Sequence, residues 1–264
     1  MRFSEHLKKA SHVGAFFVFV LFSLQAQALC PVSGALARVK VATVIDGDTL
    51  RLADGRSVRL IGLNAPEIGR KGTRGEPFAE AAKLKLKALV SASNWQVGLR
   101  IGPQAKDHYG RVLAHAYDDK DRNLEALLLA DGLGVFVAIA PNTQLVSCHR
   151  TVEHEARMAG RGVWRKSPVI PAKQLRKGGF AIIKARVERV ESNRGGIWLE
   201  LGGSAVLQVP HDAAASFGES LHNLAGKELE ARGWVLDRKG RADLSRQARW
   251  LLKISHPSML IVRP

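Results

Sequence analysis

The sequence predicts a mainly β fold with helices, of the α+β class, divided into two parts. In the first half, short strand-like segments rich in β-branched residues occur together with three helical segments. The second half consists almost entirely of strand-like segments. Residues 166–179, with two prolines, two adjacent glycines and several basic residues, separate the halves. We therefore expect a small closed barrel with helices packed against it, followed by a second, smaller β-barrel domain.

The elements of the first half follow from the spacing of apolar residues. Five strands are expected, at residues 37–45, 49–54, 57–63, 95–102 and 112–118. Three helices are expected, at residues 76–92, 122–132 and 142–160. Asp54-Gly55 forms the turn between the second and third strands. Gly132 and Gly160 are placed to end the last two helices, and Asn142 is placed to cap the third.

The second half has the strand order of an OB-type barrel. Five strands are expected, at residues 180–191, 195–202, 205–210, 227–237 and 249–255, with a helix at 212–226 after the third. Trp198, Trp234 and Trp250 could stack on nucleic-acid bases, but core packing is expected for most of them. The expected domains are residues 29–168 and 179–264, joined by a linker at 169–178, and the second domain is expected to bind nucleic acid.

The N-terminal segment, residues 1–28, is typical of a cleaved signal peptide. A positive start precedes the apolar run at residues 13–24, and Ala26-Gln27-Ala28 fits a cleavage site after Ala28. The run is too short to span a bilayer as a helix, so no stable membrane insertion is expected after cleavage. The mature protein is expected to be secreted or periplasmic. In such an oxidising compartment, Cys30 and Cys148 would form a disulfide; the alternative is a buried thiol at Cys148.

The formal net charge of +16 favours an anionic partner, either nucleic acid or acidic membrane lipid. A basic surface also serves solubility, so charge alone does not choose among these alternatives. His149 and His154 are five residues apart on the third expected helix. That spacing does not place them on one helical face as a metal pair, and both are expected to be solvated.

Five polar or charged residues are not explained by strand formation. Asp48 begins a strand, Arg59 interrupts an apolar run, Asn64 and Glu67 lie in a proline-bearing turn, and Arg111 follows another turn. A short antiparallel meander can bring such positions to one face of a barrel. Phosphodiester hydrolysis needs these groups, because hard cations take oxygen ligands, a carboxylate activates water, and arginines bind phosphate through forked hydrogen bonds.

Three segments that contain these residues, "IDGDTLRL", "VRLIGLNAPE" and "DHYGRVLA", resemble the signature blocks of the staphylococcal nuclease (thermonuclease) family, in the same order. The resemblance extends over roughly residues 37–164. It implies an OB-type five-stranded barrel with three helices. It also implies Ca²⁺-dependent hydrolysis of DNA and RNA at the 5′ P–O bond, which leaves 3′-phosphate ends.

The resemblance also implies a role for each matching residue. Asp48, Asn64 and the backbone carbonyl of Ala65 would be metal ligands. Glu67 would act as the general base, and Arg59 and Arg111 would hold the scissile phosphate. Asp46, His108 and Tyr109 would support the site, and Gly47 is expected to bend the backbone so that Asp48 faces the ion.

Two positions depart from the family pattern. Asn64 stands where an Asp ligand is usual, which removes one negative charge and allows a divalent cation other than Ca²⁺. His108 stands where a lysine is often found, so its charge depends on pH.

The leading hypothesis is an exported, Ca²⁺-dependent endonuclease that prefers single-stranded DNA or RNA. One alternative is a catalytically weak or inactive nucleic-acid-binding protein that uses the same basic surface. A third, membrane-anchored interaction module would use the N-terminal apolar run.

Overall fold

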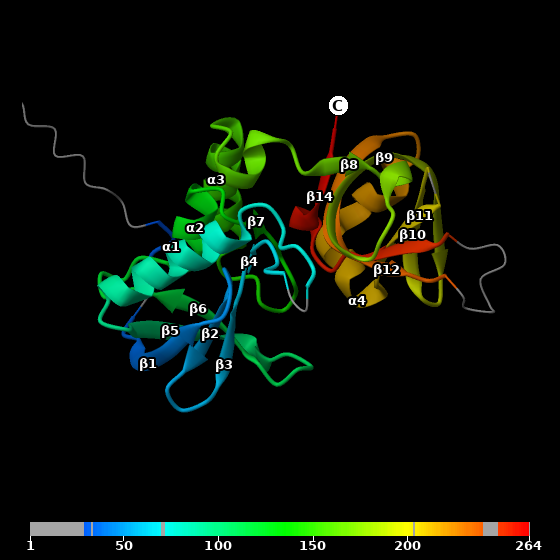
Figure 1. Ribbon diagram of the computed structural model, residues 1–264. Helices are drawn as coiled ribbons and strands as arrows, with labels where there is room; N and C mark the ends of the chain where they lie inside the picture. Colours follow the sequence, from blue (N-terminus) through cyan, green and yellow to red (C-terminus); the bar gives the residue numbers. More distant parts are fainter. Residues whose placement is uncertain (1–28, 33, 70–71, 203, 240–247, 264) are drawn as a thin grey trace, which may run out of the picture.

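The computed structural model describes residues 29–32, 34–69, 72–202, 204–239 and 248–263. The expected signal peptide, residues 1–28, lies outside the described residues. Within those ranges, no helix is long and apolar enough to cross a membrane. Figure 1 shows two barrels side by side, with α1, α2 and α3 gathered on one side of the first.

The first barrel is closed and five-stranded, as predicted. Its strands are β1 (Ala37–Val44), β2 (Thr49–Leu52), β3 (Ser57–Leu60), β5 (Gln96–Lys106) and β6 (Val112–Tyr117). The order is β1-β2-β3-β6-β5, and β1 closes the barrel by pairing with β5. Only β3 and β6 run parallel among these pairs. The α+β class and the OB-type barrel predicted for this part are therefore confirmed.

The barrel interior is filled by the apolar residues that alternate along its strands. Buried members include Val41, Leu50, Val58, Val97 and Ala114. Since successive side chains of a strand point to opposite faces, the polar residues between them point outward or lie at strand ends. Burial of the apolar set thus fixes the strand register and, with it, the direction of Asp48 and Arg59.

Three helices pack against this barrel: α1 (Ala79–Ala92), α2 (Leu124–Ala130) and α3 (Val146–Met158). α1 starts later than expected, because Phe78 has a φ of 69° and lies outside the helix. The expectation that Asn142 caps α3 is wrong, because Leu145 is the N-cap residue. Asn142 instead bonds the β5 backbone, accepting from Gln104 N (2.9 Å) and donating to Gln104 O (3.0 Å).

A separate two-stranded sheet positions the turn that follows β3. It pairs β4 (Leu63–Asn64) with β7 (Val135–Phe136), and Asn64 lies opposite Val135. This pairing holds the backbone of Asn64 even though the residue lies at the end of a very short strand.

The second part repeats the strand order of the first. Its strands β9 (Gly179–Asn193), β10 (Gly196–Leu201), β11 (Ala205–Val209), β12 (Glu228–Asp237) and β13 (Trp250–Lys253) form a ring, because β12 pairs with both β13 and β9. β11 and β13 run parallel, as β3 and β6 do in the first barrel. The second, OB-like barrel expected in the fold class is thus present. Its sheet is extended by β8 (Val169–Pro171) and β14 (Leu260–Val262).

Two segments of this part differ from expectation. The helix expected at 212–226 is α4 (His211–Ala214) followed by a 3-10 segment (Ala215–Leu224), and Gly218 has non-helical backbone angles. The stretch expected to be a linker is structured. β8 pairs with β9, and a 3-10 turn at Ala172–Gln174 follows it. Ala172 and Leu175 are buried, so this segment contributes apolar surface to the core instead of only joining the barrels.

Candidate active site

The residues predicted to form the site meet at one cavity of about 820 Å³. Eight of the nine line it: Asp46, Asp48, Arg59, Asn64, Glu67, His108, Tyr109 and Arg111. Ala65, the ninth, is only 3% exposed and lies behind the surface. Trp234 also lines the cavity, although it belongs to β12 of the second barrel.

Asp48 is the buried acid of the cavity. Its Oδ2 accepts a hydrogen bond from Ala65 N (2.7 Å) and lies 2.9 Å from Arg59 Nη1, while its Oδ1 accepts from Thr49 Oγ1 (3.1 Å). Burial, with a smaller effect of the Asp46 charge, raises the pKa of Asp48 to about 6 against the opposing effect of Arg59. Asp46 supports the turn by accepting a hydrogen bond from Asp48 N (3.1 Å).

Gly47 is required for close packing rather than for a special backbone bend. A Cβ at this position would lie 2.6 Å from Cβ of Ala65 and 2.6 Å from Cβ of Ala82. The expectation that Gly47 serves mainly to bend the chain therefore needs correction. Because Gly47 has no side chain, the Asp46-Gly47-Asp48 turn packs directly against α1 and against Ala65, whose backbone N donates to Asp48.

Arg59 joins the acid to the turn that follows β3. Its Nη1 donates to the carbonyls of Leu63 (2.9 Å) and Leu60 (3.2 Å), and its Nη2 donates to Asn64 Oδ1 (3.2 Å). With the Asp48 contact, the guanidinium thus bonds both side chains predicted as metal ligands. Its side chain is 13% exposed, so these contacts are shielded from bulk water.

Arg111 ends the loop between β5 and β6, directly before the strand that pairs with β3. Its Nε donates to Asp107 Oδ2 (2.7 Å), and Asp107 Oδ1 accepts from the backbone N of both Tyr109 (3.0 Å) and Arg111 (2.9 Å). Burial would raise the pKa of Asp107, but the hydrogen bonds from Arg111 hold it below its usual range. Tyr109 is 73% exposed, and the Arg111 guanidinium lies 5.4 Å from its ring centroid.

Asp107 was missed by sequence reasoning, although it begins the "DHYGR" block. The available signal was an Asp followed by a short turn that contains glycine, since such Asp side chains commonly bond backbone N–H groups further along the turn. The His108 and Tyr109 rings lie against each other in a tilted arrangement, with 3.7 Å between their centroids. The loop therefore presents Arg111 and two rings to the cavity.

Glu67 is exposed at the cavity wall. Its backbone is held on both sides, because Glu67 N donates to Glu76 Oε2 (3.0 Å) and Glu67 O accepts from Glu76 N (2.9 Å). These bonds fix the chain beyond Pro66 while the Glu67 carboxylate faces the cavity. A carboxylate in contact with solvent can accept hydrogen bonds from water, which suits a group that positions a nucleophilic water.

The donor atoms of the cavity fit a hard cation by type. Asp46 and Asp48 supply carboxylate oxygens, and Asn64 supplies an amide oxygen. Within the described ranges, no three His, Cys, Asp or Glu side chains come together as a metal-binding group. A cation here would therefore rely on the Asn64 amide and on backbone oxygen as well as carboxylate, and all of these are ligands that Ca²⁺ accepts.

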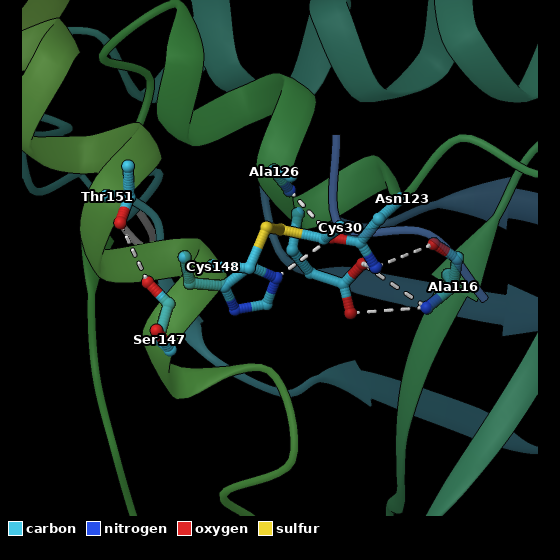
Figure 2. Close-up of a disulfide and its surroundings, with 9 residues drawn as sticks. Cys30, Ala116, Asn123, Ala126, Ser147, Cys148 and Thr151 are labelled. Carbon is cyan, nitrogen blue, oxygen red and sulfur yellow. Dashed lines mark hydrogen bonds between the residues drawn. A yellow bond between two sulfur atoms is a disulfide. The ribbon is translucent and has the colours of Figure 1, made fainter. Parts of the chain in front are cut away.

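A disulfide joins Cys30 to Cys148 near the N-terminal end of α3, with 5.6 Å between their Cα atoms. Figure 2 shows this bond beside Asn123, whose Oδ1 accepts from Ala126 N (2.8 Å) and whose Nδ2 donates to Ala116 O (3.4 Å). The bond ties the start of the described chain to α3.

The expectation that His149 is solvated is wrong, whereas His154 is exposed. His149 is 1% exposed, and its Nε2 lies 2.9 Å from Asn123 Oδ1. A Cβ at Gly62 would lie 2.2 Å from His149 Nδ1, so the ring occupies space that only glycine leaves free. Burial, with a smaller effect of His115, lowers the pKa of His149 to about 3. This histidine is a neutral core residue.

Comparison with known proteins shows which family the chain resembles. A family model described as "Staphylococcal nuclease homologue" matches residues 57–166. Endonuclease YncB of Bacillus subtilis (strain 168) is 32% identical over 136 residues, which are 50% of this chain and 64% of that protein. The SPbeta prophage-derived endonuclease YokF of the same organism is 29% identical, and the match covers 45% of its length. This chain thus spans less than two thirds of either Bacillus protein.

The thermonuclease of Staphylococcus intermedius is 31% identical over 129 residues, which are 48% of this chain and 75% of the relative. The thermonuclease of Staphylococcus hyicus is 30% identical over 128 residues, which are 47% of this chain and 74% of the relative. The matches to these thermonucleases cover most of their length and about half of this chain. The chain belongs to the staphylococcal nuclease homologue family.

Proposed function

We propose that the protein is a metal-dependent endonuclease that hydrolyses phosphodiester bonds of DNA and RNA. One observation carries the proposal: Asp48, Arg59, Glu67 and Arg111, which come from three separate sequence blocks, line one cavity. If Asp48 and Arg59 formed only a structural salt bridge, there would be no reason for Arg111 and Glu67 to line the same cavity.

The two arginines are suited to hold the phosphate together, since both line the cavity. Guanidinium groups donate paired hydrogen bonds to phosphate oxygens and stabilise the charge that develops during the reaction. Arg111 is oriented by Asp107 through its Nε, and that contact does not use the terminal nitrogens. Arg59 is oriented by the carbonyls of Leu60 and Leu63.

Glu67 takes the role of general base. A water attacks phosphorus as its proton passes to the Glu67 carboxylate, and the bond to the 5′ oxygen breaks. The leaving oxygen takes up a proton from solvent, and the other fragment keeps a 3′-phosphate. Glu67 suits this role because its carboxylate is exposed while its backbone is fixed by Glu76.

Asp48, the Asn64 side chain and the Ala65 carbonyl would hold Ca²⁺ or another divalent cation, with Asp46 beside them. When bound, the ion offsets phosphate charge and orients the substrate. Arg59 contacts both Asp48 and Asn64. The arginine therefore keeps the two predicted ligand side chains close together and balances the charge of Asp48.

Single-stranded nucleic acid is the preferred substrate in this proposal, and the second barrel contributes to binding it. The formal charge of +16 supports an anionic partner. Tyr109, 73% exposed beside Arg111, offers a ring to an unstacked base.

Export to the periplasm or the medium completes the proposal. The disulfide between Cys30 and Cys148 supports an oxidising compartment. Mass spectrometry of the protein recovered from the periplasm and from the culture medium tests this, with a mature chain that begins at Leu29 as the expected result.

The decisive experiment incubates purified protein with end-labelled single-stranded DNA or RNA, with Ca²⁺, with other divalent cations or with chelator. Cleavage with metal, its loss with chelator, and a loss of about 10²- to 10⁴-fold in Glu67→Gln are expected. Glu80→Gln, an exposed acid on α1, is the matched control. If the protein binds nucleic acid but cleaves it with none of the cations, the alternative of an inactive nucleic-acid-binding protein is favoured. Asn64 is the residue that motivates this alternative.

A further inference from the structure

Three outward-facing side chains of β12 point toward the nuclease domain. Glu230, Arg232 and Trp234 alternate with Leu229, Ala231, Gly233 and Val235, which are buried in the second barrel. Residues two apart on a strand share a face. The first two of the three bind α3, and the third reaches the cavity of the candidate active site.

The contacts of Glu230 and Arg232 fix β12 relative to the nuclease domain. Arg157 of α3 donates through Nη1 and Nη2 to the two carboxylate oxygens of Glu230 (2.7 and 2.8 Å). Arg232 Nη1 lies 2.8 and 2.7 Å from the oxygens of Glu153, with the two side chains 3% and 5% exposed. Paired charges at such burial are costly to separate, so Trp234 has a defined place at the cavity.

Apolar contacts support the same placement. Val135, Ala156 and Trp164 of the first part form a buried cluster with Ile182 of β9, and Phe180 packs against this cluster. Phe180 lies directly opposite Trp234 in the β9–β12 pairing, with the rings in an edge-to-face arrangement at 5.2 Å. The Phe180 ring therefore supports the indole from the neighbouring strand.

The indole is supported but remains open. Trp234 is 43% exposed, and Ile139 beside the cavity is 47% exposed. Both residues also line a second cavity of about 470 Å³, whose wall includes Lys253 of β13. Asp212 also lines the second cavity and balances Lys253, so the two arginines of the first cavity are the groups that would meet a negative charge. An exposed tryptophan at the border of that cavity fits a ligand that carries both flat apolar groups and negative charge.

We propose that Trp234 is a substrate-binding residue on which a base of a single-stranded nucleic acid stacks while an adjacent phosphate lies between Arg59 and Arg111. This inference rests on the proposed function and deepens it. Duplex bases are already stacked and do not present a free face, so the contact selects unpaired strands. The second barrel thereby contributes a side chain to substrate choice at the nuclease site.

The test measures binding of a fluorescein-labelled single-stranded DNA 12-mer to the full chain, in chelator and without hydrolysis. Trp234→Ala should weaken binding by about 5- to 150-fold, and Trp234→Phe should keep most of it. Leu236→Ala is the matched control, because Leu236 is 45% exposed two residues along the same strand and is absent from the described lining of both cavities. Binding of a blunt duplex should be equal in all four proteins.

An abasic scan keeps the proposal testable if Trp234→Ala is poorly folded. One base at a time is removed from the 12-mer. For the wild type, binding should weaken when the removed base is the one that stacks on Trp234. The same removal should have no further effect in Trp234→Ala and a reduced effect in Trp234→Phe. Equal losses in Trp234→Ala and Leu236→Ala, or a base effect that is unchanged in Trp234→Phe and Trp234→Ala, would overturn the proposal. If the wild type cleaves with none of the divalent cations, the nuclease function is refuted. The stacking proposal is judged independently, because binding is measured without cleavage.

Discussion

Arg59 Nη1 lies 2.9 Å from Asp48 Oδ2, and the same guanidinium donates to Asn64 Oδ1 at 3.2 Å. One arginine thus connects the buried acid to Asn64, the residue proposed above as the amide ligand of a cation. Asn64 removes one negative charge from the site, while Arg59 supplies a positive charge to the acid that remains. The balance between these residues bears on both stability and metal binding.

The first prediction compares Arg59→Ala with Arg111→Ala. Arg59→Ala leaves Asp48 buried with fewer partners and frees two backbone carbonyls, so it should lower the free energy of unfolding by about 1–3 kcal/mol. Arg111 is 32% exposed, and Asp107 keeps its backbone donors, so Arg111→Ala should cost less than about 1 kcal/mol. Urea unfolding measures both. Each variant should also lose about 10²- to 10³-fold in kcat on single-stranded DNA. Equal losses of stability would contradict the structural role given to Arg59.

The second prediction concerns Asn64→Asp. A carboxylate at this position adds a charged ligand, so Ca²⁺ affinity should rise by about tenfold, and activity should reach its maximum at lower Ca²⁺. Titration calorimetry with Ca²⁺ measures the affinity. Asn64→Ala, which removes the side-chain oxygen, should weaken binding. If Asn64→Asp binds Ca²⁺ no more tightly than the wild type, the side chain at 64 is not a metal ligand.

The close agreement between sequence and structure at the cavity has a local cause. Strand alternation fixes which residues face the core, and short turns leave few ways to place Asp48, Arg59 and Glu67. The distinct blocks therefore predict the site residues that the fold brings together. The same reasoning predicted the repeated OB-type strand order, because that order depends on the sequence of elements and not on individual contacts.

The features that sequence reasoning missed depend on contacts between distant segments. Asn142 looks like a helix cap, but its side chain bonds the backbone of Gln104. His149 lies on a polar helix, yet it fills the space beside Gly62. The expectation of core packing for most of Trp198, Trp234 and Trp250 does not say which of them is exposed, because one strand pattern does not reveal what packs on its outer face. Trp250, 4% exposed, does lie in the core.

The third prediction is a pH dependence of stability caused by His149. Its pKa is about 3 in the folded protein and about 6.5 when unfolded, so between these values the unfolded state binds more protons. The contribution of neutral His149 to the free energy of unfolding is therefore present above pH 6.5, and it declines as the pH falls toward 3. The wild type should lose about 2 kcal/mol from this residue between pH 7 and pH 5.

The matched variants are His149→Gln and His154→Gln. His149→Gln should be less stable at pH 7 but should show a flatter decline between pH 7 and pH 5, as measured by urea unfolding at each pH. His154 is exposed on the same helix, so His154→Gln should keep the wild-type slope. An unchanged slope in His149→Gln would show that this histidine is not held neutral by burial.

The last prediction concerns the buried pair that joins the two barrels. Arg232→Met leaves the Glu153 carboxylate buried, with Phe136 N still donating to it at 2.6 Å, and should lower the free energy of unfolding by about 3–5 kcal/mol. Arg232→Met combined with Glu153→Gln removes the unpaired charge and keeps an acceptor for Phe136, so most of that loss should be recovered. Arg189→Met is the control, because its pair with Glu200 is exposed and should contribute less than about 1 kcal/mol.

Urea unfolding, followed by both tryptophan fluorescence and far-ultraviolet circular dichroism, distinguishes the outcomes. Coincident transitions in the wild type and separated ones in Arg232→Met would mean that this pair couples the barrels. A loss in the double variant as large as in Arg232→Met would mean that stability comes from the ion pair itself and not from avoiding a lone buried charge.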